Sequence, residues 1–488
     1  MTTRGPDLAS RLAGQEPVRV AREALGGEEG VWIVGGAVRD AALDRAVTDI
    51  DLAVTADPGA VARRIADAAG GFAFELSAEF GSWRAAARDR SWQVDVTALR
   101  GEGIAGDLAL RDFTIGAVAV PLGGEGLLDP HGGLADLEGR VLRVVGSAAF
   151  EDDPLRLLRA PRLAAELGLQ IDQETADLAR AAAPSAAVPA GERQLAELRA
   201  LIAGPDPVGG FRLMDGLGVT AAVLPEVEAM RGVEQGPNHH LDVYDHTLAV
   251  LANLLEIEAD LPRYAGDRAD EVAGMLAEPL ADDFTRRDAL RLGALLHDIG
   301  KPGTAEDRGG YRTFIGHDAS GAETASAICR RLRASRRLGV HVAGLARHHL
   351  RLGFLVPQRP LPPRTVHEYL RATGDVAVDV TLLTVADRLA ARGSGPLAGD
   401  EMVRGHLDLA VEMIAAALDW RREGPPRPLL AGDELAAELG IDPGPSLGEA
   451  LAELEAAQYA GEVTSRDEAV RHARASLTAR GTGGEGGG

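Results

Sequence analysis

The stretch VWIVGGAVRDAALDRAVTDIDLAV, residues 31–54, decides the fold of the N-terminal part of the chain. An apolar run, 31–34, ends in Gly35 and Gly36, a helix-like pattern follows, and a second apolar run begins at residue 49. This order predicts a strand, a tight turn, a helix and a second strand.

Acidic side chains are placed regularly on the second strand and on a later one. Successive strand residues point to opposite faces, so Asp49 and Asp51 share one face while Ile50 and Leu52 enter the core. The run SWQVDVTALR adds Asp95 from another strand by the same alternation. Surface aspartates on an edge strand are the simpler interpretation of such a pair alone. Converging carboxylates, however, are what Mg²⁺ uses together with substrate phosphates.

The turn before the first helix favours a phosphate ligand. Gly35 and Gly36 let backbone N–H groups approach phosphate oxygens, and a helix N-terminus attracts anions. Arg39, one turn later, can add a charge-assisted hydrogen bond. A glycine turn that can bind phosphates and a group of carboxylates that can bind Mg²⁺ together predict a binding site for a nucleoside triphosphate.

The chain of 488 residues divides by its patterns into four segments and a tail. Strand-like and helical runs alternate first, and helical patterns follow to the end, so we expect an α+β protein. The segments are an α/β head (1–145), a helical neck (146–228), a histidine-containing helical domain (229–400), a small helical C-terminal domain (401–478) and a disordered tail (479–488).

Composition limits the partners and the compartment. The formal charge of −23 argues against indiscriminate nucleic-acid binding, so any site for a polyanion must be local. Cys329 is the only cysteine, which excludes an intrachain disulfide and fits a reducing cytoplasm. We find no apolar leader and no apolar run of about 18 residues, and therefore expect neither export nor membrane insertion.

Histidines and aspartates cluster in the third segment. A lone buried histidine is usually a satisfied core residue, but four clusters on helix-like segments suit Mn²⁺, Ni²⁺ or Zn²⁺. The predicted ligands are His246, His297, Asp298, His317, His348 and Asp387. Lys301, the only lysine, either neutralises a phosphate or closes a helix as its C-terminal cation.

The succession of motifs resembles the bacterial class II tRNA nucleotidyltransferases and poly(A) polymerases. The motifs are GGAVRD with DID, then LRDFTIGA (110–117), LLDPHGGLADLEGRVLRVV (127–145), EDDPLRLLRAPRLAAELGL (151–169), GERQLAELRALI (191–202) and GFRLMDGLGVTAAVLPEVE (210–228). The histidine segment resembles the HD phosphohydrolase superfamily. This resemblance implies a polymerase-beta-type nucleotidyltransferase head followed by all-helical neck, HD and C-terminal domains. It also implies that the neck, 146–228, binds the nucleotide base and RNA.

The resemblance also implies roles for individual residues. Asp49 and Asp51 would bind catalytic Mg²⁺, with Asp95 at the third acidic position. The nucleotide would be bound by Gly35, Gly36, Arg39, Arg111, Asp112, Asp153, Arg156, Arg159 and Arg162. Asp153 can accept from the amino group of cytosine or adenine while Arg156, paired with it, donates to their acceptors. The implied partners are the tRNA 3′ end, CTP and ATP.

Three departures keep other functions open. Leu110 and Gly116 replace an arginine and an asparagine of the family, and Asp152 replaces a glutamate. Only GEGIAG, 101–106, stands where CCA-adding members carry a long flexible segment, which resembles the CC-adding subgroup. Alternatively the head is degenerate and the chain is an HD-type phosphohydrolase, or it is a poly(A) polymerase.

Overall fold

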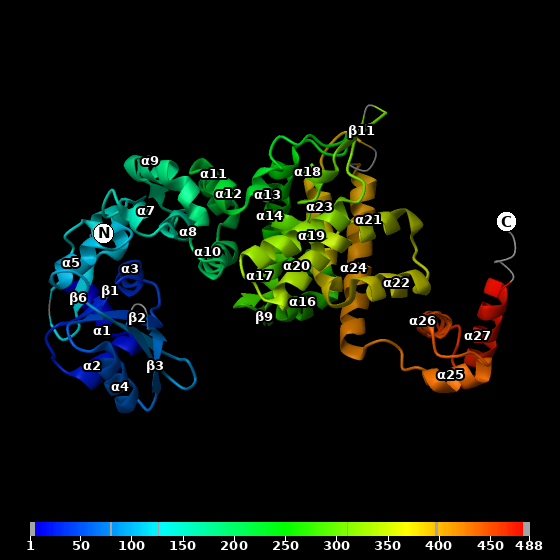
Figure 1. Cartoon of the computed structure of the whole chain (residues 1–488), viewed down its shortest axis with the longest axis horizontal. Helices are drawn as coiled ribbons and strands as arrows, with labels where there is room; N and C mark the ends of the chain where they lie inside the picture. The colour runs from blue at the N-terminus through cyan, green and yellow to red at the C-terminus, as the bar shows by residue number, and fades with distance from the viewer. Residues whose placement is uncertain (1–4, 79–80, 125, 310, 396–398, 482–488) are drawn as a thin grey trace. The chain divides into compact units, whose positions relative to one another are not determined.

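The computed structural model describes residues 5–78, 81–124, 126–309, 311–395 and 399–481 (Figure 1). The chain divides into two compact units, Met1–Val223 and Leu224–Gly488. Mixed sheet and helices form the first unit, and the second is almost entirely helical. The expected α+β class is confirmed.

A six-stranded sheet forms the centre of the first unit, in the order β3-β4-β5-β2-β1-β6. The β2 and β5 strands pair in parallel, and every other neighbouring pair is antiparallel. The strands are β1 (Val31–Val34), β2 (Asp49–Val54), β3 (Phe72–Ser77), β4 (Ser82–Ala86), β5 (Gln93–Ala98) and β6 (Ala119–Pro121).

One face of the sheet is buried against helices α1 (Gly5–Ala13), α2 (Glu16–Leu25) and α4 (Pro58–Ala68). Ile50 and Leu52 on β2 are in this core, as the alternation predicts, and each is at most 2 % exposed. Asp49 and Asp51 lie on the other face of β2. Because Ile50 and Leu52 are buried on the first face, the two carboxylates must point to the opposite one.

Shorter elements complete the first unit. They are α3 (Gly36–Ala42), α5 (Gly103–Ala109), α6 (Gly133–Glu138), α7 (Ala149–Asp152), α8 (Arg156–Leu167), α9 (Gln173–Ala182), α10 (Gly191–Ala203), α11 (Pro207–Gly216) and α12 (Val219–Val223). The strand expected in RVLRVV is shortened to β7 (Val141–Leu142), which pairs in parallel with β8 (Gln170–Ile171). Helix α8 packs against α10 and α11, and this packing forms the neck.

The second unit begins with the histidine-containing helices. Its elements are α13 (Pro225–Glu228), α14 (Val243–Ala259), α15 (Leu261–Ala265), α16 (Ala269–Leu276), β9 (Pro279–Ala281), β10 (Phe284–Thr285), α17 (Arg286–Leu296), α18 (Lys301–Thr304), β11 (Glu306–Arg308), β12 (Tyr311–Thr313), α19 (His317–Arg331), α20 (Arg336–His348), α21 (Arg351–Leu355), α22 (Pro363–Thr373), α23 (Ala377–Ala390) and α24 (Asp400–Glu423). Helices α14, α17, α20 and α23 pack on one another, and α19 pairs with α20.

The helical domain extends past its expected end at residue 400. Helix α24 packs along α23, and His406 bonds to Thr384 at 3.2 Å, so the domain includes α24. A separate apolar core begins at Leu430 and is formed by α25 (Gly432–Leu439), α26 (Pro445–Tyr459) and α27 (Arg466–Gly481). Of the expected tail, 482–488 lie outside the described residues. Within the described part of the chain, every helix is too short or too polar to cross a membrane.

Candidate functional site

Three carboxylates converge on the open face of the sheet. Asp49 and Asp51 lie on β2, and Asp51 is in register with Asp95 on β5. Desolvation by the surrounding protein, Asp95 and Asp49 together raise the pKa of Asp51 to about 6, against the lowering effect of Arg111. A bound cation would relieve this repulsion, so the residues present fit a divalent metal ion.

Asp95 is held by an arginine that the sequence patterns did not indicate. The Arg84 side chain on β4 donates from Nε to Asp95 Oδ1 at 2.6 Å and from Nη2 to Oδ2 at 2.7 Å. This bidentate pair offsets part of the charge of Asp95 and fixes its orientation. Arg84 was missed because only the pairing of β4 with β5 brings the two residues together.

The turn at Gly35 brings the backbone close to these acids. Gly35 has a φ of +73°, and a Cβ there would lie 2.9 Å from Asp51 Oδ2 and 3.2 Å from Arg111 Nη1. A side chain is therefore excluded by both conformation and space. Gly36 begins α3, and Arg39 on that helix bonds to Asp40 at 2.9 and 3.0 Å.

A cavity of about 210 Å³ gathers most of the predicted nucleotide-binding residues. Its lining consists of Arg100, Arg111, Asp112, Asp153, Leu155, Arg156, Arg159 and Arg193. Five of these residues were predicted from the sequence, whereas Gly35, Gly36, Arg39 and Arg162 do not line the cavity. The arginines give the cavity the positive charge that a nucleoside triphosphate requires.

Arg159 joins the head to the neck at this cavity. It donates to Asp112 Oδ2 at 2.8 Å and to Glu197 Oε1 at 3.2 Å. Burial alone would raise the pKa of Asp112, but the Arg159 charge and the bond from the Phe113 N–H lower it below its usual value. Asp112 is therefore a fixed negative charge beside the cavity.

The predicted pairing of Asp153 with Arg156 is absent. Arg156 donates to the carbonyl oxygens of Ala149 at 3.1 Å and Leu110 at 2.7 Å, while Asp153 Oδ2 accepts from Arg193 at 2.9 Å. Both side chains still line the cavity, each held by a different partner. Leu110 accepts this hydrogen bond with its backbone carbonyl oxygen. The replacement of the family's arginine by leucine at position 110 therefore does not remove the bond from Arg156.

Arg162 has a packing role. Its Nε donates to Glu197 Oε2 at 2.6 Å and its Nη1 to Glu166 Oε2 at 2.7 Å. Both acids hold the guanidinium away from the cavity. The expected stripe of three arginines on α8 is therefore divided, and its last member stabilises the helices α8 and α10.

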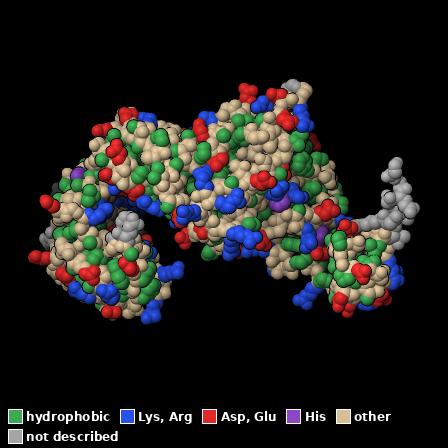
Figure 2. Space-filling model, viewed as in Figure 1, with side chains coloured by type: hydrophobic (Ala, Val, Ile, Leu, Met, Phe, Trp, Pro, Cys, Tyr) green, Lys and Arg blue, Asp and Glu red, His purple; other side chains and the backbone are tan. Residues whose placement is uncertain are grey.

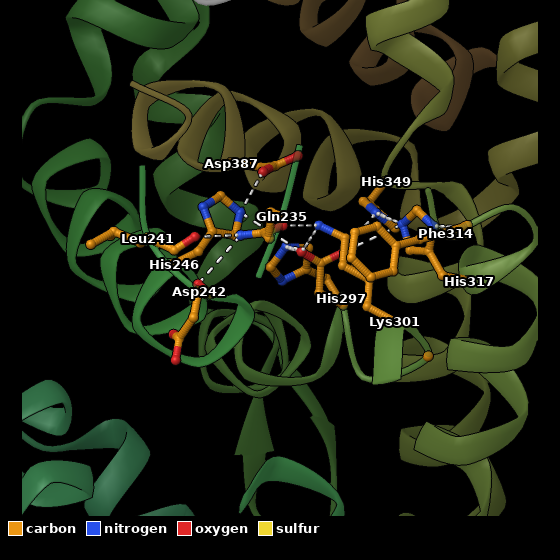
Figure 3. Close-up of polar contacts among 12 residues, drawn as sticks. Gln235, Leu241, Asp242, His246, His297, Lys301, Phe314, His317, His349 and Asp387 are labelled. Atoms are coloured by element: carbon orange, nitrogen blue, oxygen red, sulfur yellow. Dashed lines mark hydrogen bonds and ion pairs between the residues drawn. The ribbon is translucent and has the colours of Figure 1, made fainter. Parts of the chain in front are cut away.

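Two groups of potential metal ligands lie inside the second unit (Figure 3). His246 Nε2 lies 2.9 Å from Asp387 Oδ1, and His317 Nε2 lies 3.3 Å from His349 Nε2. The first group is His246, His297 and Asp387, and the second is Asp298, His317 and His349. Two adjacent ligand sets are the arrangement that a two-ion site requires.

Backbone carbonyls orient the imidazoles. His297 Nδ1 lies 2.8 Å from Ala294 O, and His349 Nδ1 lies 2.7 Å from Ala346 O. A bond at Nδ1 leaves Nε2 directed into the cluster, as metal-binding histidines require. His297 Nε2 and Asp298 Oδ1 are buried without a hydrogen-bond partner. These atoms fit a bound metal ion.

The acids of the cluster are held in their charged form. Burial would raise the pKa of Asp387, but the bond to His246 and its charge lower it far below the usual value. The pKa of Asp298 is also well below its usual range, against burial, because of His297 and Lys301. Ionised carboxylates are the form that coordinates a cation.

His348 is absent from the cluster, and its neighbour His349 is present. His348 Nδ1 accepts from Arg351 Nε at 2.9 Å on the outer side of the domain. Adjacent helical residues point about 100° apart, and the pattern HH did not indicate which one faces inward. The structure assigns the inward position to His349.

Lys301 lies within bonding distance of the cluster. Its Nζ donates to Asp298 Oδ2 at 2.6 Å and to Gln235 Oε1 at 2.7 Å. It is the first residue of the short helix α18 and follows the end of α17 at Leu296. Lys301 and Asp298 contribute to the lining of a cavity of about 800 Å³ that opens from the cluster.

Family models match three parts of the chain. They describe a poly A polymerase head domain at 31–107, a probable RNA and SrmB-binding site of polymerase A at 168–231, and an HD domain at 243–392. Fold, sites and these matches define a nucleotidyltransferase that carries an HD domain.

Relatives identify the family. The chain is 36 % identical to an A-adding tRNA nucleotidyltransferase of Deinococcus radiodurans, over 90 % of this chain and 94 % of the relative. It is 34 % identical to a CC-adding tRNA nucleotidyltransferase of Thermus thermophilus, over 89 % and 91 %. The chain belongs to the tRNA nucleotidyltransferase family.

Solved structures share the fold. A CCA-adding enzyme in complex with ATP matches with a TM-score of 0.63 at 20 % identity, over 96 % of this chain and 98 % of that one. A Thermotoga maritima CCA-adding enzyme complexed with tRNA matches with a TM-score of 0.59 at 21 % identity, over 96 % and 98 %.

Proposed function

We propose that this protein adds cytidine to the 3′ end of tRNA, using CTP and releasing pyrophosphate. The observation that carries the proposal is the Asp49 and Asp51 pair on β2, in the same unit as a cavity lined by Asp153 and Arg156. The CC-adding relative at 34 % identity supports cytidine addition, and the A-adding relative at 36 % identity supports nucleotide transfer to tRNA.

The reaction is an in-line displacement at phosphorus. The 3′-hydroxyl oxygen of the tRNA bonds to the α-phosphorus of CTP, the bond from that phosphorus to the bridging oxygen breaks, and pyrophosphate leaves. Asp49 and Asp51 would hold Mg²⁺, with Asp95 as the third acid. That ion lowers the pKa of the hydroxyl and neutralises the leaving group when it is bound.

The chain's own residues position the nucleotide. The Gly35–Gly36 turn allows N–H groups close to the triphosphate, and Arg39 adds a cation. Arg111 and Asp112 lie near the sugar, and Asp153 accepts from the cytosine amino group while Arg156 donates to its ring acceptors. Uracil lacks that amino group. Adenine shares it, so these two contacts alone do not distinguish ATP from CTP.

We further propose that addition stops after two cytidines. Helix α5 begins at Gly103, within the segment 101–106, and the backbones of Gly101 and Gly106 are packed closely together. A segment this short has no room for the long arm of CCA-adding members.

A tRNA transcript without its end, extended with CTP and ATP separately and together, tests this. A product two nucleotides longer in every reaction that contains CTP supports the proposal. Efficient addition of a terminal A contradicts the CC-adding assignment. Extension with ATP alone favours a poly(A) polymerase.

A second activity is proposed for the HD domain. The paired ligand groups and the orphaned atoms of His297 and Asp298 support a metal-dependent phosphohydrolase acting on phosphomonoesters or 2′,3′-cyclic phosphates at RNA ends. Mn²⁺, Ni²⁺ or Zn²⁺ suits its imidazole and carboxylate ligands. Hydrolysis of a nucleoside 2′,3′-cyclic phosphate with each metal tests it, and His297→Ala is expected to abolish the reaction. Equal hydrolysis by this variant would contradict the proposal.

A further inference from the structure

A basic groove of about 540 Å³ lies between α19 and α20, and we call it the α19–α20 groove. Small residues and cations dominate its lining, which consists of Ala322, Glu323, Ser326, Arg330, Ala343, Gly344, Arg347 and His348. Figure 2 shows blue side chains over these two helices, whose cationic residues are arginines. On a chain with a net charge of −23, this concentration of cations is a local feature.

The two arginines of the groove are free to bind a ligand. Arg330 and Arg347 are exposed, and no ion pair is found for either within the part of the chain that the structure describes. Elsewhere arginines are commonly paired, as Arg291 is with Glu258 and Arg364 with Glu462. Glu323 is the groove's one carboxylate and is exposed, so its charge is screened by water.

His348 also lines the groove, and its Nδ1 accepts a hydrogen bond from Arg351 Nε at 2.9 Å. The positive field comes from the arginines and attracts an anion.

The groove and the cavity of the metal-ligand cluster share a lining residue. Arg347 contributes to the lining of both, and Arg312 and Arg351 add cations to the cavity. The cavity also has two exposed apolar side chains, Ile315 at 68 % and Phe354 at 69 %. Arginines beside apolar and aromatic surfaces bind the phosphates and bases of single-stranded nucleic acid.

We propose that the α19–α20 groove binds the phosphate backbone of a single-stranded RNA whose 3′ end enters this cavity. The part of this inference that concerns the RNA's terminal phosphate rests on the phosphohydrolase activity proposed for the HD domain. The groove makes a polymer a better substrate than a mononucleotide, because Arg330 and Arg347 contact phosphates upstream of the reacting end. Phe354 stacks with a base near the cavity.

The test uses the full chain, a fluorescent dodecaribonucleotide with a 3′-phosphate, and a nucleoside 3′-phosphate. The variant is Arg330→Ala with Arg347→Ala. The control is Arg263→Ala with Arg404→Ala, which removes two exposed arginines of the same unit from α15 and α24. Binding in EDTA is measured by anisotropy against salt, and hydrolysis of both substrates is measured with added Mn²⁺ or Ni²⁺.

We expect the groove variant to bind the RNA about tenfold more weakly, with a salt slope smaller by about 1.4, since each lost phosphate contact removes about 0.7. Its kcat/KM for the RNA falls by a similar factor, while hydrolysis of the nucleoside 3′-phosphate is unchanged. Unaltered binding and salt slope in the groove variant, or an equal loss in the control, overturns the proposal. If the parent hydrolyses neither substrate, the HD activity fails, and the binding measurement decides the groove alone.

Discussion

Asp51 on β2 lies directly opposite Asp95 on β5, and Arg84 holds Asp95 with two hydrogen bonds of 2.6 and 2.7 Å. Arg84 therefore fixes the orientation of Asp95. Desolvation, together with the charges of Asp95 and Asp49, raises the pKa of Asp51 to about 6, and a bound cation would relieve this repulsion.

Asp51→Asn should stabilise the metal-free protein at pH 7. The folded-state pKa lies above the unfolded value, so the wild type binds protons more tightly when folded and loses stability as the pH rises from about 4 to 6. The gain is about 1 kcal/mol, because water reaches the exposed side chain and reduces the full effect of the shift. Urea unfolding in EDTA measures it. The difference should vanish below pH 4, and a less stable variant at pH 7 contradicts the account.

Asp153→Ala and Arg156→Ala should reduce base selectivity. Each removes one bond to the base edge, and such bonds discriminate by about 1 to 3 kcal/mol. We expect the ratio of kcat/KM for CTP over UTP to fall about 10- to 100-fold in each. Single-nucleotide incorporation measures the ratio. Arg193→Ala removes the partner of Asp153 and should give a smaller loss in the same direction. Unchanged selectivity in all three variants rules out this cavity as the base site.

Arg162→Ala should lower stability without changing nucleotide affinity. Its bonds to Glu197 and Glu166 are short, and the Glu197 side chain is only 11 % exposed. Loss of a charged partner costs about 1 to 3 kcal/mol, seen as a lower midpoint in thermal or urea unfolding. The KM for CTP is the second measurement. A raised KM with unchanged stability would assign Arg162 to nucleotide binding.

His349→Ala and His348→Ala form a matched pair for the HD domain. His349 Nε2 belongs to a ligand group, whereas His348 bonds to Arg351 outside it. We expect His349→Ala to weaken Mn²⁺ or Ni²⁺ binding at least about tenfold, while His348→Ala leaves it unchanged. Calorimetric titration of the metal-stripped protein measures both. Equal metal affinities in the two variants contradict the assignment.

Much of the head was predictable because strand alternation is a local rule. The pattern of DIDLAV fixed the face of Asp49 and Asp51, and the same rule placed Asp95 on that face. Arg84 and Arg193 were not predictable from spacing, since they reach Asp95 and Asp153 through tertiary pairing. The spacing of the arginines on α8 likewise did not indicate that Arg162 bonds to Glu197 on α10 and so does not line the cavity.

In the second unit, the order of histidines and aspartates predicted a metal-ligand cluster but did not resolve neighbours. His348 and His349 differ only in helical phase, and packing of α20 against α17 decides which is buried. Packing also decides the domain boundary, because α24 has apolar residues that α23 covers.

The central claim is that Asp49 and Asp51 hold the metal ion for nucleotide transfer. The most direct measurement is extension of an end-trimmed tRNA transcript with CTP and Mg²⁺ by the parent, Asp49→Ala and the control Asp67→Ala, which changes an exposed acid on α4. We predict extension by the parent and the control and none by Asp49→Ala, with all three proteins equally folded by circular dichroism. Extension by Asp49→Ala at the parental rate would contradict the account.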